Sequence, residues 1–171
     1  MIKEKSLFKL CITALLCVLA VVANRVLGIN TQFLSISVSF VPVMVCSMLL
    51  GPLYGGVCGG LADLIGALLF PFGPFFPGFT LTAFFSGALF GFIPTKSSGK
   101  RFFSVTFLIF LLEEVFCTVL LNSLWISLLY GSPFFPLVLT RLPKATVLVV
   151  LGPFVAFLIK KHLLPPINKI L

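Results

Sequence analysis

Long apolar runs, separated by short polar or proline-rich connections, make up most of the chain. A helix that crosses the hydrocarbon core of a bilayer needs about 20 mostly apolar residues. Six runs come close to that length: 7–27, 36–51, 53–70, 79–95, 103–129 and 137–160. The pattern predicts an all-α membrane protein, in which residues 1–171 form a single domain of six transmembrane helices. Because Ala23–Asn24–Arg25 is a poor cleavage context for a signal peptide, the first run is expected to be a retained helix.

Composition supports this interpretation. Hydrophobic residues make up 60% of the chain and charged residues only 9%, and the mean hydropathy is +1.24. A soluble domain carries about 25% charged residues. A multi-pass protein of a cell membrane of the prokaryotic type is therefore expected, with the lipid bilayer as its surroundings.

Lysine and arginine mark one side of the predicted bundle. Nine of the twelve basic residues lie in the N-terminal segment, the fourth connection and the C-terminal segment: Lys3, Lys5, Lys9, Lys96, Lys100, Arg101, Lys160, Lys161 and Lys169. With six helices all nine fall on the same side, and the positive-inside rule places that side and both termini in the cytoplasm. Topology then explains most of the net charge of +8, and no nucleic-acid partner is expected.

The other three basic residues, Arg25, Arg141 and Lys144, fall on the opposite, outer side. The positive-inside rule does not require them there, so two interpretations stay open. Their side chains reach lipid headgroups by snorkelling, or they receive an anionic ligand that arrives from outside. Arg141 and Lys144 are three residues apart and share a helix face, which suits a pair of carboxylates.

Three acidic residues lie in the middle of predicted helices: Asp63, Glu113 and Glu114. Ionisable residues at that depth are costly and usually functional, although an interhelical ion pair or hydrogen bond is the structural alternative. At helical spacing one polar stripe follows: Glu114, Thr118, Asn122 and Trp125. Glu113 lies on a different face of an ideal helix. Glu114, Asn122 and Trp125 are therefore predicted to contact a ligand, and Glu113 to serve helix packing or coupling.

The third and fourth predicted helices are joined by a stiff, aromatic connection. Residues 71–85 read PFGPFFPGFTLTAFF, with three prolines and six phenylalanines. Proline limits the entropy that is lost on ordering, and Phe75, Phe76 and Phe79 can offer ring faces to a flat ligand. The alternative is an interfacial anchor, because aromatic residues gather at that depth.

The first outer connection has alternating serines. Ser35, Ser37 and Ser39 are two residues apart, which predicts a short extended segment with one polar side. Such a segment can gate a pocket, and Ser39 is a candidate ligand contact.

The sequence lacks the motifs of ATP hydrolysis, metal binding and catalysis. There is no GxxxxGK[ST] phosphate loop, the single histidine is His162 in the C-terminal segment, and no catalytic constellation or internal repeat is found. We expect no enzyme, no cofactor and no metal site. A solute-binding subunit that takes energy from a partner fits best. An assembly factor or an enzyme that acts on lipids stays open as the alternative.

Two stretches resemble a known family. The first is residues 35–91, which include GPLYGGVCGGLADLIG at 51–66 and PFGPFFPGFTL at 71–81. The second is residues 120–144, which read LLNSLWISLLYGSPFFPLVLTRLPK. Together they resemble the folate-specific substrate-binding subunits of energy-coupling factor (ECF) vitamin transporters. Ser123 stands where that family has threonine in N-T-L-W. The resemblance runs from the first helix to the start of the sixth.

The resemblance implies a six-helix bundle with cytoplasmic termini and an outward-facing folate site. It also implies partners: a transmembrane coupling protein and two ATPase subunits. Folate consists of a flat pterin, a benzoate ring and a glutamate tail with two carboxylates. The phenylalanines are then expected to hold the two rings, and Glu114 or Asp63, with Asn122, to accept hydrogen bonds from the pterin. Arg25, Arg141 and Lys144 are expected to pair with the tail.

The coupling protein of this family docks on small residues of the first helix. That role carries over to Ala14, Cys17 and Ala20, although the Ala-x-x-x-Ala spacing is absent because Val18 follows Ala14 by four residues. Riboflavin and thiamin are the nearest alternative ligands. Thiamin is a cation and riboflavin is uncharged, so neither explains the outer basic residues.

Overall fold

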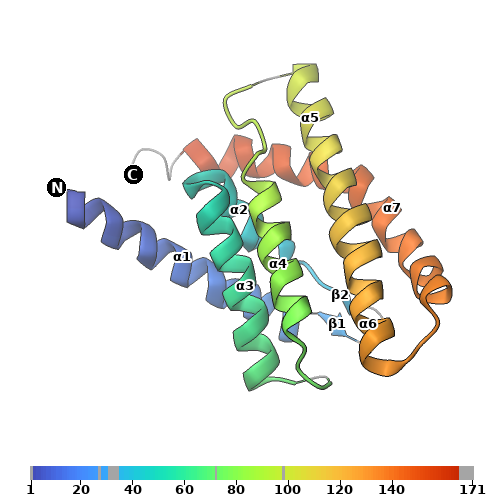
Figure 1. Ribbon diagram of the computed structural model, residues 1–171. Coiled ribbons are helices and arrows are strands. Elements are labelled where there is room, and N and C mark those ends of the chain that lie inside the picture. The colour runs from blue at the N-terminus through green and yellow to red at the C-terminus, as the bar shows by residue number, and fades with distance from the viewer. Residues whose placement is uncertain (1, 27, 31–34, 72, 98, 166–171) are drawn as a thin grey trace.

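The computed structural model describes residues 2–26, 28–30, 35–71, 73–97 and 99–165 (Figure 1). Its elements are, in chain order, α1 Ile2–Arg25, β1 Ile29–Asn30, β2 Ser35–Ile36, α2 Phe40–Leu50, α3 Pro52–Leu69, α4 Pro77–Phe90, α5 Gly99–Leu112, the π-helix η1 Glu113–Leu121, α6 Asn122–Tyr130, α7 Phe134–Leu158 and the π-helix η2 Ile159–Leu163. The two strands pair antiparallel, with Ile29 opposite Ile36. Apart from this pair, the regular structure described is helical.

Four helical segments are long and apolar enough to cross a membrane: Leu7–Arg25, Pro52–Leu69, Gly99–Tyr130 and Phe134–Leu163. The last two each join several elements without a break. The helices Phe40–Leu50 and Pro77–Phe90 are apolar but shorter. The predicted all-α membrane architecture is confirmed at this level.

Two short helices differ in extent from their apolar runs. The run 36–51 gives a helix that begins only at Phe40, because Ser35 and Ile36 pair with β1. The run 79–95 gives a helix that begins earlier, at Pro77, and ends at Phe90. Proline fits the first turn of a helix because its missing N–H needs no partner there.

The connections gather at two ends of the bundle. Figure 1 shows the start of α1, the end of η2 and the α4–α5 connection toward one end, and the α3–α4 and α6–α7 connections at the other. At the first end Lys160 of η2 donates a hydrogen bond to the carbonyl oxygen of Ser97. This contact ties the last helix to the α4–α5 connection.

Glycines let α3 and α4 pack closely. A Cβ atom added at Gly59 would lie 2.5 Å from the carbonyl oxygen of Ala83, and one at Gly55 would lie 2.7 Å from that of Gly87. Side chains at these positions would force the two backbones apart. Small residues at such spacing are typical of helix contacts in membranes.

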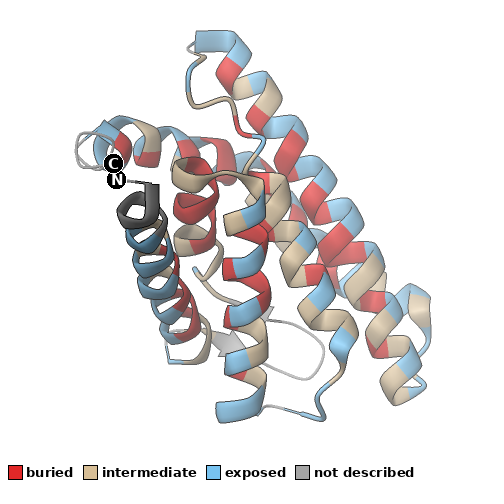
Figure 2. Ribbon diagram, turned by 60° about the vertical axis from the view of Figure 1, so that its left-hand side comes forward, coloured by how far each residue is buried: buried red, intermediate tan, exposed pale blue. Residues whose placement is uncertain are grey.

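The first helix presents an apolar outer side and a buried inner side (Figure 2). Cys17 and Ala20 lie on the inner side, with exposed fractions of 4% and 1%. They pack in a cluster with Cys46 and Cys58 of α2 and α3. The prediction that Cys17 and Ala20 form a docking surface is therefore wrong, because the bundle itself covers them. Ala14 is exposed.

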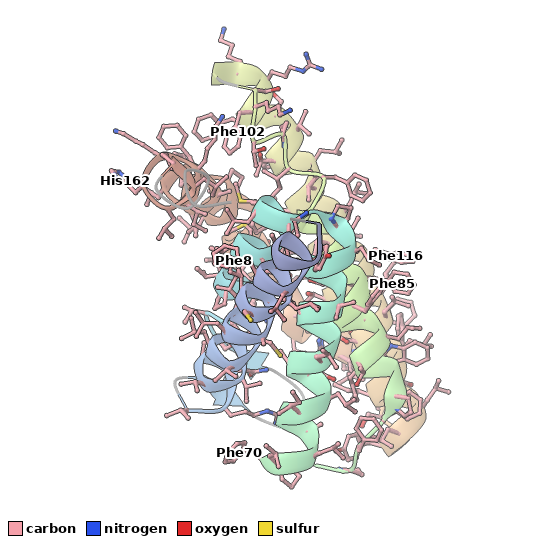
Figure 3. All side chains as sticks on the ribbon, turned by 90° about the vertical axis from the view of Figure 1, so that its left-hand side faces the viewer. Phe8, Phe70, Phe85, Phe102, Phe116 and His162 are labelled. Carbon is pink, nitrogen blue, oxygen red and sulfur yellow. The ribbon has the colours of Figure 1, made fainter. Side chains whose placement is uncertain are left out.

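Large apolar side chains cover the outside of the bundle. Figure 3 shows Phe8, Phe85 and Phe116 projecting away from it, and these side chains are 40%, 43% and 53% exposed. Such a surface is costly in water and suits a hydrocarbon environment. The polar groups that could form a binding site are therefore the buried ones in the interior of the bundle.

Candidate functional site

The long helix Gly99–Tyr130 changes its hydrogen bonding where its acidic residues lie. From Glu113 to Leu121 it is a π-helix, in which bonds run from residue i to i+5. The wider turn brings residues four and five apart onto one side. Glu113, Glu114, Cys117, Thr118 and Asn122 therefore all face the interior of the bundle.

A cavity of about 360 Å³ lies inside the bundle, with walls from α1, α3, α4, η1, α6 and α7. Most of the predicted site residues line it: Arg25, Ser39, Asp63, Phe75, Phe76, Phe79, Glu114, Asn122, Arg141 and Lys144. The exception is Trp125, which lies behind Phe76 with ring centroids 5.5 Å apart. Residues far apart in the sequence thus meet around one space.

Two glutamates of η1 have different surroundings within this wall. Glu113 accepts a hydrogen bond from Ser86 of α4, with 2.7 Å between Ser86 Oγ and Glu113 Oε1. This hydrogen bond joins two helices, which is the kind of packing contact predicted for Glu113. Glu113 also lines the cavity, which the α-helical spacing did not predict. Glu114 is 3% exposed, and its Oε2 has no hydrogen-bond partner among the described residues.

Arg141 and Lys144 reach the same region from α7. Arg141 is 6% exposed and donates a hydrogen bond from Nη1 to the carbonyl oxygen of Thr118, at 3.1 Å. Lys144 is attracted by both Glu113 and Glu114. These two cations therefore sit against the acidic wall and not at an exposed membrane surface. This position disfavours the snorkelling interpretation.

Arg25 forms a separate cationic group on the α1 and α3 side. Its Nη1 donates to the carbonyl oxygen of Phe70, at 2.9 Å, and its charge is attracted by Asp63. Asp63 accepts a hydrogen bond from Thr80 of α4, at 2.9 Å. The three outer basic residues are therefore split into two groups on different walls of the cavity.

The aromatic connection lies at the cavity with its rings packed against one another. The centroids of Phe76 and Phe79 are 6.1 Å apart, with an angle of 75° between the rings. This edge-to-face arrangement is favourable for aromatic pairs. On the first outer connection Ser37 and Ser39 share a hydrogen bond of 2.8 Å, and both line the cavity.

Some cavity residues were not predicted from the sequence. Ser86, Tyr130 and Asn24 line the cavity as well. Ser86 lies seven residues after Phe79, which is two helical turns, so its shared face with that phenylalanine was a usable signal. Among the described residues, no group of three or more histidine, cysteine, aspartate or glutamate side chains could hold a metal ion.

Comparison with known proteins gives consistent matches. The family model of the ECF transporter, substrate-specific component, matches residues 8–161. Two relatives are each named folate transporter FolT. The one from Clostridium novyi (strain NT) is 34% identical over 79% of this chain and 77% of its own length. The one from Leuconostoc mesenteroides is 29% identical over 70% of this chain and 63% of its own length.

A solved structure shares the fold. The crystal structure of FolT bound with folic acid superimposes with a TM-score of 0.79 and 31% sequence identity, over 89% of this chain and 92% of that chain. These relatives are transport components and not enzymes, so the alternatives of an assembly factor and a lipid-acting enzyme are not favoured. The family match extends over nearly all of the helical bundle, and it establishes this chain as a member of the ECF transporter substrate-specific components, which are multi-pass membrane proteins.

Proposed function

We propose that this chain is the folate-binding component of an ECF transporter and captures folate from outside the cell. The cavity carries the proposal, because it combines an aromatic wall, buried carboxyl groups and two cationic groups. Its volume of about 360 Å³ falls in the usual range for small-molecule sites, about 300–1,000 Å³. The relatives named for folate support the choice of ligand.

The pterin is assigned to the acidic wall. Its amino group and ring N–H are donors and need acceptors in a buried site. Glu114 is the preferred partner because its Oε2 is buried without a hydrogen-bond partner among the described residues. Asp63 is second, because its Oδ2 already accepts from Thr80. Asn122 lines the same wall and can supply a further contact.

The aromatic side chains are assigned to the two flat parts of the ligand. Phe75, Phe76 and Phe79 line the cavity. A ring contact contributes about 0.5–1.5 kcal/mol beyond the burial of its area. Ser39 is assigned to the edge of the site, where its hydroxyl can bond to a polar group of the ligand.

The glutamate tail is assigned to the cationic groups. Arginine binds carboxylates with two parallel hydrogen bonds, which favours Arg25 and Arg141 for this task. Lys144 adds charge, although Glu113 and Glu114 already attract it. Arg25, on the α1 and α3 side, is the first choice for the tail, because Arg141 and Lys144 lie against the acidic wall that is assigned to the pterin.

The same proposal includes topology and partners. We assign six transmembrane helices in one domain, made by α1, α2, α3, α4, the segment Gly99–Tyr130 and the segment Phe134–Leu163. Both termini are assigned to the cytoplasm, in agreement with the basic residues at that end. A transmembrane coupling protein and two ATPase subunits are the proposed partners, and the outer side of α1, which includes Ala14, is the proposed docking surface.

Calorimetric titration of the detergent-purified protein with folate tests the proposal, with thiamin and riboflavin as controls. We expect one-to-one binding of folate alone. Neutralisation of the α7 cations in Arg141→Gln and Lys144→Gln is expected to weaken that binding, and the control Lys161→Gln is not. Thermal unfolding in detergent identifies any variant that fails to fold. Binding of thiamin or riboflavin in place of folate, or of none of the three, would overturn the assignment.

A further inference from the structure

A hydrogen-bond relay joins α6 to the first turn of α4. Trp125 donates from Nε1 to Thr82 Oγ1, at 2.9 Å, and Thr82 Oγ1 lies 2.9 Å from the carbonyl oxygen of Gly78. A hydroxyl group can accept one hydrogen bond while it donates another. Thr82 is 3% exposed and forms part of the cavity wall.

The indole ring of Trp125 also packs against this turn. A Cβ atom added at Gly78 would lie 2.6 Å from Trp125 Cδ2 and 2.5 Å from Phe76 Cε1. The absence of a side chain at Gly78 lets both rings approach the backbone. Trp125 therefore holds the start of α4 by hydrogen bonding and by packing.

A second aromatic residue of α6 makes a similar approach. A Cβ atom added at Gly73 would lie 2.6 Å from the hydroxyl oxygen of Tyr130. Gly73 lies in the connection that leads to α4, so Trp125 and Tyr130 contact the two ends of one short stretch. That stretch contains Phe75 and Phe76, which line the cavity.

We propose that Trp125 and Thr82 form a latch that fixes Phe76 and the first turn of α4 at the cavity wall. Trp125 is then a positioning residue and does not contact the ligand, in contrast to the prediction from the sequence. The latch sets how long the ligand stays bound, because Phe76 can leave the wall only when the relay opens. This inference rests on the proposed function for its ligand, although the latch itself does not require folate.

The replacement Thr82→Val removes both hydrogen bonds at nearly constant volume. Loss of a typical hydrogen bond changes an equilibrium or rate by about fivefold, and we expect folate to dissociate from Thr82→Val about fivefold faster or more. Thr82→Ser keeps the hydroxyl and should restore the slow rate. The control is Thr106→Val: Thr106 of α5 is fully buried, and its Oγ1 has no partner among the described residues. Thr82 lines the cavity and Thr106 does not. Trp125→Phe, which keeps the Thr82 hydroxyl, therefore separates the latch from a direct contact between Thr82 and the ligand: faster dissociation in Thr82→Val alone would refute the latch.

Tryptophan fluorescence reports the latch directly. Trp125 is the only tryptophan of the chain. We expect Thr82→Val, but not Thr106→Val, to shift the emission of the ligand-free protein, because the indole N–H loses its acceptor. Folate dissociation is followed by stopped-flow mixing with a competing folate analogue.

The outcomes separate the two proposals. Failure of the wild type to bind folate overturns the proposed function, while the emission of the ligand-free variants still tests the latch. An unchanged emission and dissociation rate in Thr82→Val would refute the latch. Trp125→Phe should match Thr82→Val, and the double variant should add little to either, since both remove the same bond. A loss of affinity in Trp125→Phe far beyond that of Thr82→Val would mean that Trp125 contacts the ligand.

Discussion

The guanidinium of Arg25 depends on a glycine of α3. A Cβ atom added at Gly66 would lie 2.7 Å from Arg25 Nε and 3.2 Å from its Nη2. Ordinary contacts of this kind begin at about 3.5 Å. In Gly66→Ala the guanidinium must therefore withdraw by roughly 0.8 Å. Such a shift disrupts the 2.9 Å hydrogen bond from Nη1 to the carbonyl oxygen of Phe70.

The size of the effect follows from the charge of the group. A hydrogen bond of a charged side chain contributes about 1.5–3 kcal/mol. If Arg25 is misplaced and loses its bond to the ligand, affinity for folate should fall by about 10- to 150-fold. The helix itself should not be weakened, because alanine favours a helix over glycine by about 1 kcal/mol.

A ligand without the glutamate tail isolates the role of Arg25. We would titrate wild type and Gly66→Ala with folate and with pteroate, which ends at the benzoate carboxylate. The matched control is Gly60→Ala, where the added Cβ would have its nearest atom, Phe84 Cβ, at 3.4 Å. Folate affinity should fall in Gly66→Ala alone, and pteroate affinity should stay unchanged. Equal losses for both ligands, or no loss for folate, would refute the assignment of Arg25 to the tail.

Two further substitutions test ligand binding at Glu114 and helix packing at Gly59. Glu114→Gln should weaken folate binding by about 10-fold or more, since the pterin loses an acceptor. Thermal stability should fall, because Lys144 and Arg141 lose a carboxyl group that attracts them. An unchanged titration would exclude Glu114 as the pterin partner. Gly59→Ala should destabilise the protein by about 1–3 kcal/mol, because its Cβ would meet the Ala83 carbonyl at 2.5 Å. Thermal unfolding in detergent measures this against Gly60→Ala, and equal midpoints would contradict the close α3–α4 packing.

The sequence predicts the helices and most of the cavity residues for a simple physical reason. A helix that crosses the bilayer needs an apolar run of a certain length, so the runs can be recognised in the sequence. An ionisable residue within such a run is costly to bury, and it usually marks a functional position. Asp63, Glu114 and Arg141 therefore stood out without any structure, and all three line the cavity. The aromatic connection stood out because prolines and phenylalanines rarely gather without a constraint.

Other features depend on geometry that spacing does not carry. The prediction for Glu113 assumed an α-helix, and the π-helix η1 turned its side chain into the cavity wall. Cys17 and Ala20 are small residues, and small residues suit an internal contact as well as an external one. Only the position of α2 and α3 decides between the two. The role of Trp125 likewise depends on Thr82, which lies 43 residues away.

The π-helical segment lets one continuous helix carry more residues than an α-helix of the same total turn. Each of its turns holds more residues than an α-helical turn. Deletion of Phe116, whose side chain is exposed on the apolar surface, would let the segment close as an α-helix. Each residue of an α-helix turns the chain by about 100°, and a residue of the wider π turn turns it by less. One residue fewer with tighter winding gives a similar total turn, so α6 would keep its orientation and Asn122 would stay at the cavity, while Glu113 and Glu114 would no longer both face it. At an exposed position, the loss of one residue would thus change which acidic side chain reaches the binding wall.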